Sequence, residues 1–169
     1  MRKEYGKVLR KACDEGMAAA GMGWERQALK SLWLMPGERA YARRLSDSLT
    51  GWCVLSPHAE RDSFTIDIGW SRLGRFPELG MRPSALVAEV DFGRDECWVR
   101  LGELATGEDI CWEVGTGVAR SMADLQAMVT PLDAATARAR VLPCVEGALA
   151  ALQAHGEAFL AEAARHGAE

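Results

Sequence analysis

The feature that most constrains this chain is a strict alternation between residues 64 and 70. Every second residue is large and apolar: Phe64, Ile66, Ile68 and Trp70. Thr65, Asp67 and Gly69 stand between them. Successive side chains of a strand point to opposite faces, so the pattern predicts a β-strand with one face in the core and the other open to water. A chain with such a strand must cover the apolar face with further elements.

Other short β-type runs precede and follow this strand. They lie at residues 32–35, 40–45, 49–55, 97–101 and 110–114. The connections are too short for crossover helices, which favours antiparallel pairing. We expect residues 102–109 to form a hairpin connection between the last two strands. The long segment 71–94 is expected to be an ordered loop with one helical turn near residues 83–88.

Helical periodicity marks the two ends of the chain. Apolar residues recur at steps of three and four between residues 3 and 20, and Gly21 and Gly23 end that helix. Ser121, with Asp124 three residues later, predicts a capped helix to about residue 129. A longer, Ala-rich helical region follows. The expected fold is α+β: an N-terminal helix, an antiparallel meander sheet of about five to six strands, and C-terminal helices packed on one face.

Composition and charge limit the classes of protein. The 169 residues are 49% hydrophobic and 26% charged, which is typical of a globular chain. We expect a single domain over residues 1–169. The net charge of −4 argues against nucleic-acid binding, although residues 1–50 hold 10 basic and 6 acidic side chains. Neither a secretion signal nor an apolar stretch of transmembrane length is apparent. Five cysteines without a CxxC pair fit reduced thiols in the cytoplasm.

Several common catalytic and metal-binding motifs are absent from the sequence. There is no HExxH and no GxSxG, and we expect no metal and no cofactor. The catalytic candidates are two carboxylates, Asp67 on the polar face of the clearest strand and Glu113 in a later strand. If those two faces coincide, the pair could do acid–base work. A solvated sheet face also carries such residues without any catalytic role.

All six tryptophans fall between residues 24 and 112, within the expected sheet. Buried tryptophan is core material first of all. Trp98 is nevertheless out of phase with its apolar neighbours, and an aromatic row on the open face would suit a protein or apolar ligand. Trp98 and Trp112, with Arg75 in the long loop, are therefore the candidate binding residues. Core and binding surface both stay open as roles for the tryptophans.

Several short pieces of the chain occur in the order found in a family of uncharacterised bacterial α+β domains. These pieces are residues 23–24, 32–34, 52–55, 64–70 and 111–114. The chain resembles that family along most of its length, except that the Asn usual before the glycine of the Phe strand is not found, since Asp67, Ile68 and Gly69 stand there instead. The resemblance implies an α+β fold. It implies no activity and no site residue.

The leading functional hypothesis is a non-enzymatic binding protein of the bacterial cytoplasm, such as an immunity protein that neutralises a toxin. The alternative is a small hydrolase-type enzyme that uses Asp67 and Glu113. A third possibility is a homo-oligomer formed through the C-terminal helix.

Overall fold

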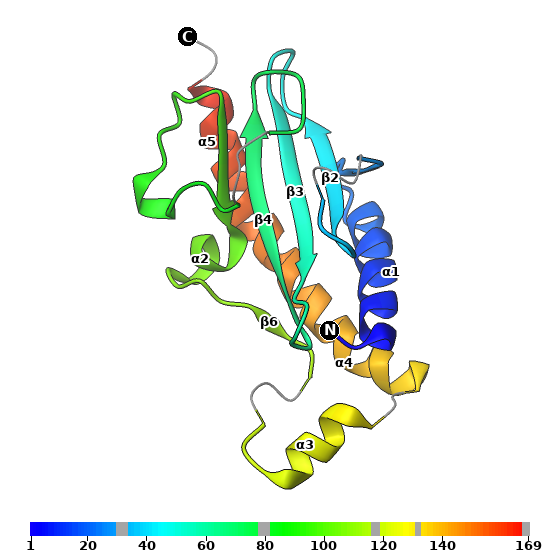
Figure 1. The fold of residues 1–169 in the computed structure, drawn as a ribbon. Coiled ribbons are helices and arrows are strands. Elements are labelled where there is room, and N and C mark those ends of the chain that lie inside the picture. The colour runs from blue at the N-terminus through cyan, green and yellow to red at the C-terminus, as the bar shows by residue number, and fades with distance from the viewer. Residues whose placement is uncertain (30–33, 78–81, 116–118, 131–132, 167–169) are drawn as a thin grey trace.

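The computed structural model describes residues 1–29, 34–77, 82–115, 119–130 and 133–166. One antiparallel sheet forms the centre of the fold (Figure 1). Its strands are β1 (Glu25–Gln27), β2 (Arg39–Arg44), β3 (Thr50–Pro57), β4 (Ser63–Ser71) and β5 (Glu96–Arg100), paired in chain order. A short β6 (Trp112–Glu113) pairs with the beginning of β4. The α+β class and the meander are thus confirmed.

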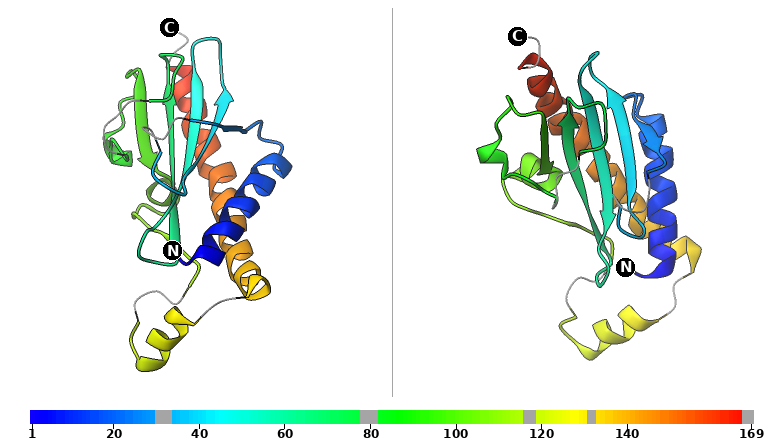
Figure 2. Two further views of the ribbon diagram at one scale, coloured as in Figure 1. Left: turned by 45° about the vertical axis from the view of Figure 1, so that its right-hand side comes forward. Right: turned by 45° about the horizontal axis from the view of Figure 1, so that its top comes forward.

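Helices cover one face of this sheet. α1 (Lys3–Ala19) packs its apolar side there and ends before Gly21 and Gly23, both of which have positive φ. α4 (Ala134–Ala151), the π-turn η2 (Leu152–Gly156) and α5 (Glu157–Arg165) form a second helical rod on the same side (Figure 2). Between sheet and helices lies the main core, which includes the four predicted β4 residues: Phe64, Ile66, Ile68 and Trp70.

The C-terminal rod uses its apolar stripe inside the chain. Val141, Val145, Ala148, Leu152 and Leu160 are all buried in the main core. Asp133 caps the start of α4, because its carboxylate accepts from the backbone N–H of Thr136 at 2.7 Å. The stripe that we considered for oligomerisation is therefore occupied by contacts with α1 and the sheet.

The opposite face of the sheet is covered as well, so the expectation of a face open to water is wrong. Six buried residues form a second apolar cluster there: Ala40, Ala42, Trp52, Val54, Phe76 and Trp98. Loop residues Leu29 and Leu34 pack against the cluster, and Phe76 itself belongs to the loop after β4. We call this side of the sheet the loop-covered face. The alternation in the sequence correctly identified which residues share a face of the sheet. It did not predict that this face is covered, because the loops that cover it show no periodic pattern.

Three local predictions are wrong. The first strand is β1, whereas residues 34–35 are not in a strand and residues 32–33 lie outside the described residues. Residues 101–106 form a helix, α2 (Leu101–Thr106), instead of a hairpin connection. The following strand, β6, pairs with β4 and not with β5. The α2 turn sits tightly on residue 110, since a Cβ at Gly102 would lie 2.5 Å from the carbonyl oxygen of Ile110.

Two other local predictions are confirmed. Among its described residues, the long loop contains one helical turn, η1 (Val87–Glu89). The capped helix exists as α3 (Met122–Val129), and the hydroxyl of Ser121 accepts from the N–H of Asp124 at 3.1 Å. α3 projects from one end of the molecule, away from the sheet (Figure 1).

Candidate functional site

Asp67 lies at the centre of the loop-covered face and is only 3% exposed. Its register partner on β5 is Arg100, whose Nη1 lies 3.2 Å from Oδ1 of Asp67. A second guanidinium comes from the loop after β4: Nη1 of Arg82 is 4.0 Å from Oδ2. The strand pairing fixes the first contact, and the loop supplies the second.

Glu38 adds a second buried carboxylate to this group. It accepts a hydrogen bond from Arg82 at 2.8 Å and from the hydroxyl of Ser56 at 2.7 Å. It also accepts from the backbone N–H of Met35 at 2.7 Å, which fixes the turn before β2. We call Glu38, Asp67, Arg82 and Arg100 the charge cluster. Two acids and two bases give it no net charge, and its members tie both covering loops to the sheet.

Burial raises the pKa of Asp67 from 3.8 to about 6. Arg100 and Arg82 oppose that rise by favouring the carboxylate, whereas Glu38 and Asp109 add to it. Burial therefore outweighs the two guanidinium groups. A carboxyl group with this pKa can donate or accept a proton near neutral pH. Of all the candidates named from the sequence, Asp67 has the environment that best fits acid–base chemistry.

Glu113 does not join Asp67. It is exposed and lies opposite Ser63 in the register of β6 with β4. Asp67 is four residues further along the same strand, which corresponds to about 13 Å at the usual rise of a strand. The two faces do coincide, as the sequence argument required, but the carboxylates are too far apart to share one reacting group.

Trp98, one of the two tryptophans predicted for a binding surface, is instead part of a closed aromatic layer. Trp52, Gly69 and Trp98 stand side by side across three strands. The ring of Phe76 packs on both tryptophans, at centroid distances of 5.0 Å and 5.6 Å. The guanidinium of Arg82 lies 5.7 Å from the Trp98 ring centroid. Trp98 is fully buried, so it offers no surface to a partner in this conformation.

The other two binding candidates lie apart from that layer. Trp112 is half-buried and stacks on Phe64 at 5.6 Å between ring centroids. Arg75 lies at the far end of β4, where its guanidinium is 3.8 Å from a carboxylate oxygen of Glu96. The structure therefore does not bring Trp98, Trp112 and Arg75 together.

A surface that the sequence argument missed lies on α3. Met122, Leu125 and Val129 are 78%, 49% and 80% exposed, respectively. Their spacing of three and then four residues puts them on one side of the helix. None of the residues of α3 is buried. The signal was visible in the sequence, because the same three apolar residues lie within the helix predicted from Ser121.

Arg2 joins α3 to the rest of the molecule. Its Nη1 donates to the carbonyl of Ala127 at 2.8 Å and to that of Thr130 at 3.4 Å. Its Nε pairs with the carboxylate of Asp62 at 2.7 Å. A cation at the last carbonyls of a helix also interacts favourably with the helix dipole. This tether uses backbone atoms of α3 and leaves its apolar side chains outward.

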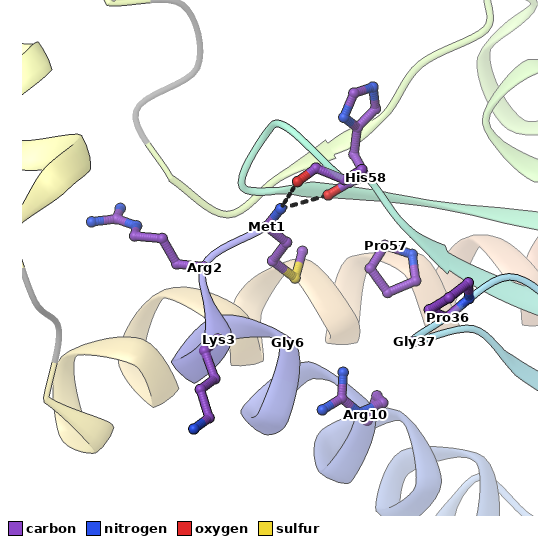
Figure 3. Close-up of a pocket in the computed structure, with 10 residues that line it drawn as sticks. Met1, Arg2, Lys3, Gly6, Arg10, Pro36, Gly37, Pro57 and His58 are labelled. Atoms are coloured by element: carbon purple, nitrogen blue, oxygen red, sulfur yellow. Dashed lines mark hydrogen bonds between the residues drawn. The ribbon is translucent and has the colours of Figure 1, made fainter.

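A cavity of about 240 Å³ lies beside the start of α1 (Figure 3). It lies between the first turns of α1, the turn at residues 36–37 and the chain at residues 57–59. Arg2, Lys3 and Arg10 contribute the charged side chains of its lining, and none of its lining residues is acidic.

Within the part of the chain that the structure describes, no group of three or more His, Cys, Asp or Glu side chains could hold a metal ion. The helices described there are all too short or too polar to cross a membrane. The chain matches no protein-family model, no curated protein and no solved structure in the comparisons with known proteins.

Proposed function

We propose that this protein is a non-enzymatic binding protein that inserts α3 into an apolar groove of another protein. The observation that carries this proposal is the exposed stripe of Met122, Leu125 and Val129. Amphipathic helices that bind grooves present anchors at positions i, i+3 and i+7. The stripe has this spacing, and the helix that bears it lies outside the core.

The chemistry of α3 favours a groove over other occupants. A helix that lies on a lipid surface usually carries Lys or Arg on its polar side, and residues 122–129 contain neither. Eight residues of helix span about 12 Å, which is little for a symmetric dimer that needs about 800 Å² from each copy. A groove that surrounds the helix would bury more of its three apolar side chains than a flat dimer interface would.

The tether through Arg2 supports the same function. Binding is strengthened when a docking element is ordered before its partner arrives. The cap by Ser121 and the two bonds from Arg2 order both ends of α3. An immunity protein of the bacterial cytoplasm, which acts only by binding a toxin, is one class that would use such a helix.

The proposal is tested with the full chain and two variants of α3. Leu125→Asp places a charge within the stripe, and Gln126→Asp places the same charge on the adjacent, exposed position. A protein that the wild-type chain captures from its native cells is purified and titrated with all three chains. We expect Leu125→Asp to weaken binding at least about tenfold, because burying an anchor leucine contributes about 1.5–3 kcal/mol. Gln126→Asp should change binding less than about twofold.

Equal affinity of the wild type and Leu125→Asp would contradict the proposal. So would self-association in sedimentation that Leu125→Asp abolishes, since the occupant would then be a second copy. Circular dichroism spectra of the three chains should coincide, because position 125 contributes nothing to the buried core.

A second candidate is a small hydrolase-type enzyme, and the pKa of Asp67 near 6 is the observation that favours it. Glu113 has no part in this version, because it lies on β6 opposite Ser63, four residues along β4 from Asp67. The measurement is hydrolysis of a panel of ester, amide and phosphate substrates by the wild type and by Asp67→Asn. Hydrolysis that the substitution leaves unchanged would remove Asp67 from the reaction.

A further inference from the structure

Two of the cations that line the cavity beside α1, Lys3 and Arg10, have no carboxylate partner among the described residues. Arg2 also lines it, but its guanidinium is already paired with Asp62 and with the end of α3. Within the described parts of the chain, neither Lys3 nor Arg10 forms an ion pair or a side-chain hydrogen bond. The N-terminal ammonium donates to the carbonyls of His58 and Ala59 at 2.7 Å and 2.6 Å. Dashed lines in Figure 3 mark the bonds made by Met1. Lys3 and Arg10 are thus the side chains left to bind a ligand.

Two glycines leave room around the guanidinium of Arg10. A Cβ at Gly6, one turn earlier on α1, would lie 3.2 Å from Nη1 of Arg10. A Cβ at Gly37, in the facing turn, would lie 3.8 Å from the same atom. Gly37 also has a φ of +94°, which a residue with a side chain rarely adopts. The guanidinium of Arg10 therefore lies between two backbone segments, and neither Gly6 nor Gly37 has a side chain that would cover it.

Further positive charge lies behind Arg10. Burial lowers the pKa of Arg39, and the neighbouring charges of Arg26 and Arg10 lower it further. The Nε of Arg39 is buried without a hydrogen-bond partner. Asp14 is the carboxylate that opposes this effect, and it already pairs with Arg26 at 3.3 Å. This side of α1 consequently carries more positive than negative charge.

We propose that this cavity binds a compact anion of the phosphate class, inorganic phosphate or a small phosphomonoester. Arg10 is the main binding residue, since a guanidinium can donate two parallel hydrogen bonds to phosphate oxygens. Lys3, which also lines the cavity, adds a second positive charge nearby. A cavity of about 240 Å³ holds a phosphate group with a few further atoms, and is smaller than the clefts that hold larger ligands. The proposal for this cavity does not rest on the docking stripe of α3.

The test is calorimetric titration of the full chain with inorganic phosphate and, separately, with glycerol phosphate, in buffer whose ionic strength is held constant with chloride. The decisive variant is Arg10→Gln, and the matched control is Lys11→Gln. The control removes the same charge from the next position of α1, where the side chain is 69% exposed and lies outside the cavity lining. We expect saturable binding that Arg10→Gln weakens at least about tenfold, because a charge-assisted hydrogen bond contributes about 1.5–3 kcal/mol. Lys11→Gln should change affinity less than about twofold.

Two results would overturn the proposal: no saturable binding of either anion, or equal weakening by Arg10→Gln and Lys11→Gln, which would indicate general attraction to a basic surface. Tighter binding of glycerol phosphate identifies a phosphomonoester site, and equal affinity identifies a site for the phosphate group alone. Arg10→Gln removes no hydrogen bond that the described structure shows, so its unfolding midpoint should match that of the wild type.

Discussion

Replacing Asp67 by Asn removes a buried carboxyl group whose pKa burial raises from 3.8 to about 6. Asparagine has nearly the same shape but does not titrate. A raised pKa means that the folded chain holds this proton more tightly than the unfolded chain does. The substitution therefore isolates the pH dependence that one buried carboxylate gives to stability.

The sign of that dependence follows from the two pKa values. Below pH 3.8 the carboxyl is protonated in both states, and the stabilising effect of its burial is fully present. Between pH 3.8 and 6 the folded chain keeps a proton that the unfolded chain loses, so the free energy of unfolding falls as pH rises. Each pH unit in this range is worth about 1.4 kcal/mol. From 3.8 to about 6, the loss comes to about 3 kcal/mol, and it is complete above pH 6.

The assay is urea unfolding of the wild type and Asp67→Asn at pH 4, 5, 6 and 7. Other titrating groups are common to both chains, so they largely cancel in the difference between the two free energies of unfolding. We expect that difference to move by about 2 kcal/mol against the wild type between pH 4 and pH 7, because part of the total loss has already occurred at pH 4. Parallel curves would refute the reasoning. The opposite slope would mean that Arg82 and Arg100 favour the charged carboxylate more than burial opposes it.

Three substitutions test the packing of β4. Trp70→Ala should cost about 3–5 kcal/mol in chemical unfolding, because Trp70 is fully buried between Phe92 and Phe159; a loss under about 1 kcal/mol would contradict its place in the core. Thr65→Ala should cost about 1 kcal/mol, since its hydroxyl accepts a hydrogen bond from the partly buried guanidinium of Arg100. No measurable cost would mean that this bond is not formed. Gly69→Ala should lower stability by about 2–3 kcal/mol or more, since its Cβ would lie 2.8 Å from the Trp98 ring and closer still to the β5 backbone; an unchanged midpoint would show that β5 shifts freely.

The sequence predicted the elements whose periodicity is strong. The alternation from Phe64 to Trp70 gave the central strand, and the apolar spacing of α1 and α4 gave the helices that cover it. Both patterns arise because one side of each element is buried. The order of apolar and polar residues along the chain is enough to reveal this. β6 is different, because its two residues pair with a strand almost fifty positions earlier. No sequence pattern near Trp112 indicates that β6 pairs with β4.

The loop-covered face shows why polarity misled the sequence argument. Asp67 and Thr65 appeared to mark a wet face because charged and hydroxyl side chains usually face water. Here each has a partner from a distant segment: Arg82 from the loop, and Arg100 from β5. A buried charge is tolerated when it is paired, and pairing between segments 15 or more residues apart leaves no local pattern. The same limit applies to the charge cluster as a whole.

Gly69 is a sequence feature that could have predicted the burial of this face. A glycine in the middle of a strand is costly unless something must approach the backbone closely. In this sheet the Trp98 ring lies where a side chain of residue 69 would be, and Phe76 closes the layer from outside. An open, solvated face would have had no use for that glycine. Gly69 was therefore the residue whose presence indicated a second packed layer, and hence a buried Asp67.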